Sequence, residues 1–225
     1  MILKLEMVSG AGTATLDRVP EGVRCRRTGQ PFEEVRVMSH LAVAVCGSPR
    51  RGANSTALAE VVLDELAACG CRCEKIELRS HRLLPCLAHD GCADLIACPQ
   101  DDDLGGILDL AYAADVLVLA TPVYYENVCG QLKLFMDRSF FLYQHDLWLR
   151  ARAVGLIAVT AETGLDEALA AMRRYVALST RDAPVVLTVG GSADAAGEAA
   201  KDDDLIAEAR RTGRALAESL GLSPV

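Results

Sequence analysis

The stretch from Val43 to Thr56 reads VAVCGSPRRGANST and turns abruptly from apolar residues to small, polar and basic ones. The apolar run Leu41–Cys46 does not alternate with polar residues, which is typical of a parallel strand covered on both faces. After the loop, Leu58, Val62 and Leu66 recur at four-residue spacing, as on the buried side of an amphipathic helix. The stretch therefore predicts a strand, a tight polar loop and a helix.

The same pattern continues along the chain. Further apolar runs occur at 115–121, 153–160 and 185–189, and a shorter alternating run, CRCEKIEL, ends at Leu78. Amphipathic segments separate these runs, so strand and helix alternate five times. Right-handed crossovers then give an α/β, flavodoxin-like doubly wound five-stranded parallel sheet of order 2-1-3-4-5 inside a three-layer sandwich.

Composition narrows the class of function. The chain has 225 residues, of which 51% are hydrophobic, enough for one globular α/β domain. A formal charge of −8 argues against nucleic acid as a partner, and no apolar run is long enough to cross a membrane. Nine cysteines without a visible secretory signal predict reduced thiols and a cytoplasmic location.

Residues 1–38 differ from the remainder of the chain. They mix Gly, Thr, Pro and scattered charges without sustained periodicity. We expect residues 1–38 to be an N-terminal extension, poorly ordered or marginally packed, or to precede an effective start at Met38. Residues 39–225 then form the flavodoxin-like domain.

The loop after the first strand has the features of an anion site. Gly47 and Gly52 permit unusual backbone angles, and Arg50 and Arg51 add positive charge. The segment Asn54–Thr56 opens the helix, whose free N–H groups favour a phosphate. Neither Gly-Lys-Ser/Thr nor G-x-G-x-x-G is present, which favours a terminal monophosphate such as that of FMN. The alternative is an ordinary connection whose polar side chains only cap the helix.

A second loop follows the strand at 115–121. It reads TPVYYENVCGQLKLFMDR from Thr121 to Arg138 and falls at the same edge of the sheet. Together with GSPRRGANST, this stretch resembles the NAD(P)H-dependent FMN reductases, and more narrowly their iron-sulfur flavoprotein branch. The resemblance extends from about Leu41 to Leu220.

The resemblance implies cofactors and residues. It implies FMN as the cofactor and NAD(P)H as a transient co-substrate, with no catalytic side chain. Ser48, Arg50, Asn54, Ser55 and Thr56 would hold the phosphate. The isoalloxazine ring would be bordered by Pro122, Val123, Tyr124 and Tyr125, and the loop 161–164, with Thr163 and Gly164, would close the site.

A cysteine-rich segment separates the two loops. The related branch carries C-x2-C-x2-C and a fourth cysteine, whereas this chain has Cys86, His89, Cys92 and Cys98. Three cysteines and a histidine suit an iron–sulfur cluster with one histidine ligand or a zinc ion. A surface loop that binds no metal remains the third interpretation.

An aromatic segment completes the set of features. Ser139–Trp148, reading SFFLYQHDLW, concentrates four aromatic residues and predicts a cover over a site or a subunit contact. In the family this region lies near a dimer interface, so we expect a homodimer or tetramer.

We expect an FMN-dependent oxidoreductase that passes electrons from NAD(P)H to a small acceptor, such as a quinone, flavin, metal ion, or nitro or azo compound. The alternatives are an electron carrier for a protein partner, with or without a cluster, and a flavin-free metal-binding or regulatory domain.

Overall fold

The computed structural model describes residues 40–182 and 184–224. The predicted extension, residues 1–38, lies outside the described residues. None of the helices in these described residues has the length and hydrophobicity of a membrane-spanning segment.

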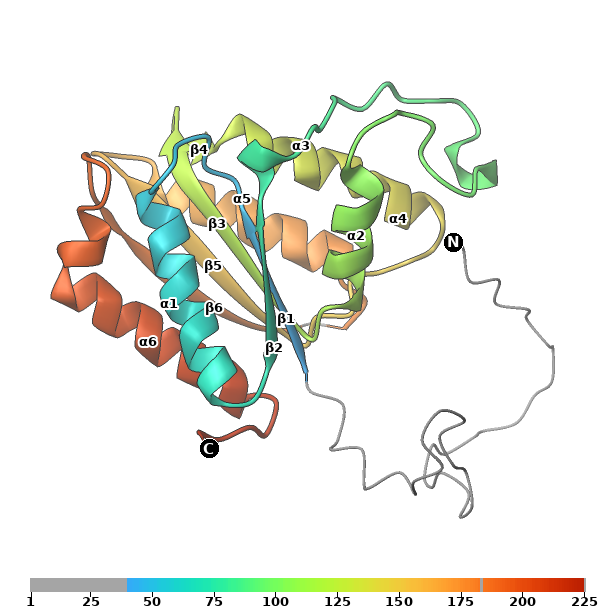
Figure 1. Ribbon diagram of the computed structural model, residues 1–225. Coiled ribbons are helices and arrows are strands. Elements are labelled where there is room, and N and C mark those ends of the chain that lie inside the picture. Colours follow the sequence, from blue (N-terminus) through green and yellow to red (C-terminus); the bar gives the residue numbers. More distant parts are fainter. Residues whose placement is uncertain (1–39, 183, 225) are drawn as a thin grey trace, which may run out of the picture. The chain divides into compact units, whose positions relative to one another are not determined.

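A central parallel sheet organises the described chain (Figure 1). Its strand order is β2-β1-β3-β5-β6, which confirms the predicted order of the parallel strands. The strands are β1 (Leu41–Cys46), β2 (Arg72–Glu77), β3 (Val116–Tyr124), β5 (Ala153–Thr160) and β6 (Val185–Ser192). A short sixth strand, β4 (Asn127–Val128), pairs antiparallel with β3 and was not predicted.

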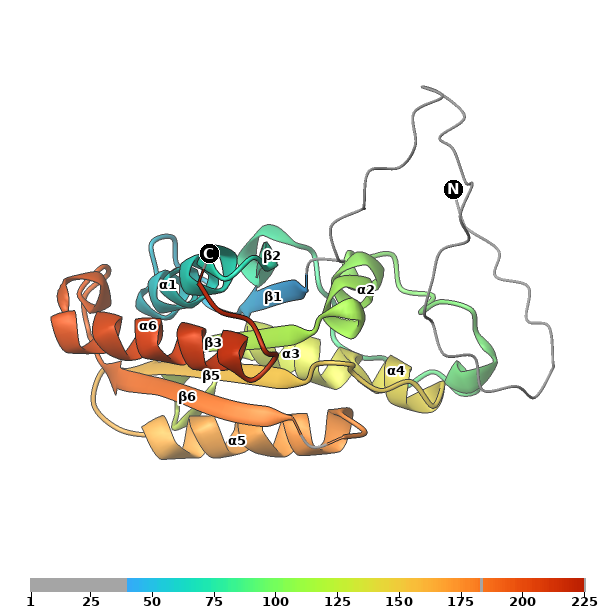
Figure 2. The ribbon, with the colours of Figure 1, turned by 90° about the horizontal axis from the view of Figure 1, so that it is seen from below.

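Helices cover both faces of this sheet. They are α1 (Asn54–Ala68), α2 (Leu104–Ala113), α3 (Gly130–Arg138), α4 (Phe140–Gln144), α5 (Leu165–Ser179) and α6 (Asp203–Glu218), with short 3-10 turns η1 (Leu78–Ser80), η2 (Cys92–Asp94) and η3 (Ala199–Lys201). Figure 2 shows α1 and α6 side by side on one face, with α5 on the other. The predicted three-layer sandwich is therefore confirmed.

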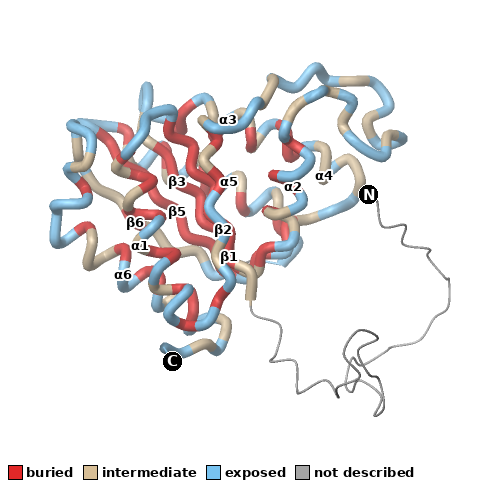
Figure 3. Tube along the Cα trace, in the orientation of Figure 1, coloured by how far each residue is buried: buried red, intermediate tan, exposed pale blue. Residues whose placement is uncertain are grey.

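The core follows from the alternation of side chains along the strands. Val43 and Val45 of β1 belong to the core cluster that contains residues of α2, α3 and α5, whereas Ala42 and Ala44 belong to the cluster that contains residues of α1 and α6. All four are fully buried, and the central strands form the buried centre in Figure 3. Burial on both faces explains why these strands read as continuous apolar runs.

One strand is longer than predicted. The apolar run ends at Thr121, but β3 continues to Tyr124. It continues because β5 pairs with Pro122 and β4 pairs with Val123 and Tyr124. Residues expected in a loop are therefore held in a strand at the edge where the candidate site lies.

Candidate functional site

The first predicted loop surrounds the N-terminus of α1. The Gly47 N–H donates to the Ala120 carbonyl at 2.8 Å, and the Arg50 N–H donates to Ser48 Oγ at 3.2 Å. Gly52 then adopts φ +60°, a left-handed angle that glycine accommodates without strain. Ala53 precedes the helix and has no side chain that can cap it. The N–H groups of the first turn therefore have no capping side chain, an arrangement that favours an anion.

Ser55 provides a direct test of whether an anion fits here. Its side chain is almost completely buried, and its Oγ has no hydrogen-bond partner among the described residues. A buried hydroxyl without a partner is costly, because it has lost water without gaining an acceptor. Ser55 nevertheless lines a cavity with Ser48 and Arg50. A phosphate in that cavity would supply the missing acceptor, so the residues fit the terminal phosphate of FMN.

The cavity is built by four separate segments. Its remaining walls come from the ends of β3 and β5 and from the segment that follows β6. The lining residues are Ser48, Arg50, Ala53, Asn54, Ser55, Pro122, Val123, Tyr124, Val159, Ala161, Ala193, Asp194 and Ala196. The carboxyl edge of the sheet, where the strand order reverses beside β1, is the expected ligand position in this architecture.

Asn54 holds the last of these segments in place. Its Nδ2 donates to the Ala195 carbonyl at 2.9 Å, and its Oδ1 accepts from the Ala199 N–H at 3.2 Å. Sequence reasoning did not find the 193–196 segment, because it carries no motif and reaches the site only through this tertiary contact.

The second loop is tied to the first. Thr121 Oγ1 accepts from the Cys129 N–H at 3.0 Å, and the Cys129 thiol donates to the Gly47 carbonyl at 3.1 Å. A Cβ at Gly47 would lie 2.7 Å from Leu132 Cβ, closer than real atoms approach. Glycine is therefore required where β1 meets the start of α3, and that contact fixes the spacing of the two loops.

Between β3 and β4 the chain makes a two-residue hairpin turn. Tyr125 and Glu126 have φ +50° and +55°, the left-handed values that such a turn needs and that usually select Asn or Gly. Gly164 packs directly against this turn, since a Cβ there would lie 2.4 Å from Glu126 Cα. Backbone strain in non-glycine residues persists where surrounding structure enforces it, often at functional sites.

An outer hollow with a volume of about 490 Å³ adjoins this inner cavity. Its lining residues are Val123, Tyr125, Glu126, Thr160, Ala161, Glu162 and Thr163. Val123 and Ala161 line both spaces, so the two lie next to each other. The Thr160 hydroxyl donates to the Thr163 carbonyl, and Ser192 Oγ donates to the Ala161 carbonyl. These two hydrogen bonds stabilise the conformation of the loop after β5.

The structure brings most of the predicted site residues together. Nine of them line one or both of the two spaces. The inner cavity is lined by Ser48, Arg50, Asn54, Ser55, Pro122, Val123 and Tyr124. The outer hollow is lined by Tyr125 and Thr163, and also by Val123.

Two predicted residues line neither space. Thr56 contacts the Cys46 thiol, whose pKa burial raises to about 12, and Gly164 contacts Glu126. Their direct contact with a cofactor stays a prediction, as do the roles of the others.

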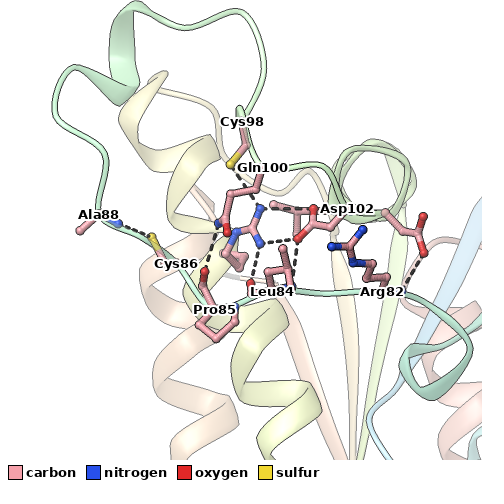
Figure 4. A network of polar contacts seen from close by, with 11 residues as sticks. Arg82, Leu84, Pro85, Cys86, Ala88, Cys98, Gln100 and Asp102 are labelled. Carbon is pink, nitrogen blue, oxygen red and sulfur yellow. Dashed lines mark hydrogen bonds and ion pairs between the residues drawn. The ribbon is translucent and has the colours of Figure 1, made fainter.

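The base of the cysteine segment is a buried ion pair (Figure 4). Arg138, at the end of α3, donates from Nη1 to Asp102 Oδ2 and to the Leu84 carbonyl, both at 2.6 Å. Both charged side chains are 1% exposed. Burial opposes ionisation of Asp102, but hydrogen bonds from Arg138 and from the Leu84 and Leu104 N–H groups outweigh it and lower the pKa of this carboxyl.

The four candidate metal ligands do not converge. Among residues 40–182 and 184–224, no group of three or more His, Cys, Asp or Glu side chains could hold a metal ion. Cys98 Sγ accepts from Arg138 Nη2 at 3.2 Å, and Cys86 Sγ accepts from the Ala88 N–H at 3.4 Å. His89 also replaces one thiolate of a four-cysteine set. These residues do not fit a four-thiolate iron–sulfur cluster as they stand.

The aromatic segment borders a separate hollow. Phe140, Tyr143 and Trp148 line it with residues of α5. His145 packs inward instead. Its Nδ1 lies 2.7 Å from the Phe141 carbonyl oxygen, and its Nε2 lies 2.7 Å from the Leu95 carbonyl oxygen. A subunit contact at this segment stays a prediction.

The sequence of this chain is similar to those of known flavoproteins. The family model described as NADPH-dependent FMN reductase matches residues 41–197. An iron-sulfur flavoprotein of Methanocaldococcus jannaschii is 30% identical over 188 residues, which cover 80% of this chain and 97% of the relative. Another, from Archaeoglobus fulgidus, is 34% identical over 149 residues, covering 66% of this chain and 67% of the relative.

Solved structures show the same fold. An NADH:FMN oxidoreductase in its apo form has a TM-score of 0.59 at 24% identity and covers 83% of this chain and 92% of its own. A flavodoxin from the domain Archaea has a TM-score of 0.52 at 15% identity, covering 80% of this chain and 99% of its own. At these identities, the likeness shows the flavodoxin-like fold alone.

Proposed function

Because the chain belongs to the NADPH-dependent FMN reductase family and is an FMN-dependent oxidoreductase, we propose that it takes hydride from NADH or NADPH and reduces a small-molecule acceptor. When bound, FMN supplies the redox chemistry, and the protein supplies binding, orientation and electrostatics. Family membership supports the cofactor and the class of reaction. The identity of the acceptor is part of the proposal.

The observation that carries the proposal is the partnerless hydroxyl of Ser55 beside the uncapped start of α1. Ser48 and Ser55 would hold the phosphate together with the N–H groups of the first turn. Arg50 lines the same cavity and would add a positive charge. Asn54 lines the cavity and also positions its wall, because its amide binds the segment after β6.

The outer hollow would border the ring system and admit the reacting partner. Tyr125 and the loop 161–163 line it, and the hairpin and Gly164 fix the distance between these walls. Such a mixture of apolar surface and a few polar groups is typical of small-molecule sites. No side chain has to act as general acid or base, so we assign no catalytic residue.

For a quinone acceptor the overall reaction balances without further reactants. NAD(P)H gives up a hydride, which carries two electrons, and solvent provides one proton. The quinone gains two electrons and two protons and becomes a hydroquinone, while the nicotinamide leaves as NAD(P)⁺.

The experiment uses the purified full-length chain reconstituted with FMN under anaerobic conditions. We expect NADH or NADPH to bleach the visible flavin absorption, and added quinone to restore it with one hydroquinone formed per nicotinamide oxidised. Bound flavin that neither nicotinamide reduces would contradict the proposal and favour the electron-carrier alternative. Chain that binds no flavin would favour the flavin-free alternative.

A further inference from the structure

The outer hollow has an unbalanced charge. Of the residues that line it, only Glu126 and Glu162 are charged, and both are exposed at its edge. Glu126 lies at the tip of the β3–β4 hairpin and Glu162 in the loop after β5. The two carboxylates therefore reach the hollow from separate segments of the chain.

No basic side chain lining the hollow offsets these charges. Lys133 and Arg174 line a different hollow beyond Asn127, where Asp137 and Glu167 balance them. Lys133 is also paired with Asp137 at 2.5 Å. Arg50 lines the inner cavity together with Asp194, so that cavity carries one charge of each sign, whereas the outer hollow carries two negative charges.

We propose that Glu126 and Glu162 select the electron acceptor by charge, so that the site reduces uncharged or cationic acceptors and discriminates against anionic ones. This inference rests on the proposed function, since it concerns the substrate of the same site. An anionic acceptor that enters the hollow meets two like charges with no compensating cation among the lining residues. Like-charge repulsion of this kind opposes the wrong ligand without adding any contact to the right one.

The expected size of the effect follows from the exposure of the two groups. Charges near a protein surface interact more strongly than in bulk water but are screened by salt. Each carboxylate should therefore change the reactivity of a singly charged anion by about threefold at low salt, and the pair by about tenfold.

The test compares naphthoquinone with its ring-sulfonated derivative, using the FMN-loaded full-length protein. The measured quantity is the ratio of kcat/KM for the uncharged quinone to kcat/KM for the sulfonated one. In Glu126→Gln/Glu162→Gln this ratio should fall about tenfold relative to the parent protein. Because glutamine keeps the shape of glutamate, the left-handed angle at Glu126 is retained.

Salt and a distant variant serve as controls. Added salt should raise kcat/KM for the sulfonated quinone in the parent protein and leave the double variant nearly unchanged. Glu218→Gln, at the exposed end of α6, removes the same charge without touching the hollow and should leave the ratio unchanged.

Two failures are distinguishable. A protein that holds FMN and turns over the uncharged quinone, but whose ratio is the same in parent and double variant, overturns the charge selection alone. A protein that binds no flavin or reduces neither quinone overturns the proposed function, and the acceptor selection with it.

Discussion

Ser55 shows how one buried atom can indicate a ligand. Its neighbour in sequence, Thr56, is also buried but contacts Cys46, whereas Ser55 lines the cavity and its Oγ has no partner among the described residues. Both hydroxyls follow the same loop, so sequence alone assigned them the same role. Only the turn of the helix separates the residue that lines the cavity from the one that packs behind it.

Ser55→Ala should weaken FMN binding without lowering the stability of the fold. The free energy of unfolding should stay unchanged or rise by about 1 kcal/mol, because a buried hydroxyl without a partner is removed. The Kd for FMN should rise about tenfold or more, since a hydrogen bond to a charged phosphate is lost. Urea denaturation and fluorescence titration measure the two quantities. Ser179→Ala, on α5 away from the cavity, is the control and should leave the FMN Kd unchanged; a marked loss of stability in Ser55→Ala would contradict the account.

Replacement of Arg138 should strongly destabilise the fold, because its guanidinium is buried against Asp102. Arg138→Met leaves the Asp102 carboxylate buried without its cation, and breaking such a pair costs about 3–5 kcal/mol. Lys133→Met breaks the exposed pair with Asp137 instead and should cost less than about 1 kcal/mol. Urea denaturation followed by circular dichroism measures both. Because Arg138→Met could fail to fold, Arg138→Lys provides a second measurement. Its free energy of unfolding should lie between those of the parent protein and Arg138→Met. Equal costs for Arg138→Met and Lys133→Met would refute the structural role.

At the scale of elements, the hairpin β3–β4 and the loop after β5 act as one unit. The hairpin turn uses Tyr125 and Glu126 at left-handed angles, and Gly164 lies against it. This contact sets the width of the outer hollow, so it should be sensitive to a single added methyl group.

Gly164→Ala tests that contact. The new Cβ would lie 2.4 Å from Glu126 Cα and meet a left-handed φ of +83°, so both packing and backbone are strained. Gly70→Ala is a matched control, because Gly70 has φ +88° but no atom within 4 Å of the added Cβ. We expect Gly70→Ala to lower the free energy of unfolding by about 1 kcal/mol, from backbone strain alone. Gly164→Ala should lower it by about 1–3 kcal/mol more, because the added methyl group also clashes. Thermal unfolding measures both. Equal losses would show that the hairpin moves aside freely.

The elements that sequence predicted well are those defined by burial. The run Leu41–Cys46 is apolar on both faces because helices cover both faces, and the other parallel strands follow the same rule. The strand β4 was missed because its turn carries Tyr and Glu where Asn or Gly would signal a hairpin.

Contacts between distant segments were also beyond sequence reasoning. The Arg138–Asp102 pair joins residues 36 positions apart, and Asn54 reaches Ala195 across 141 positions. Neither leaves a local pattern. The cysteine spacing was visible, yet the structure directs Cys98 toward Arg138 and brings no ligand set together among the described residues.

At the scale of the whole molecule, topology determines where the chemistry can take place. The order β2-β1-β3-β5-β6 brings the carboxyl ends of β1, β3 and β5 to one edge, and the phosphate cavity and outer hollow lie there. In the proposed function, a flavin would lie with its phosphate toward the start of α1 and its ring toward the outer hollow. The predicted homodimer or tetramer stays a prediction.

In the proposed function, the loop after β1 and the start of α1 hold the phosphate of FMN. The most direct measurement compares the affinities of the flavin-free protein for FMN and for riboflavin, which has the same ring system but no phosphate. Hydrogen bonds to a charged group contribute about 1.5–3 kcal/mol each, so we expect FMN to bind at least about 100-fold more tightly in a fluorescence titration. Equal affinities for FMN and riboflavin would contradict the account.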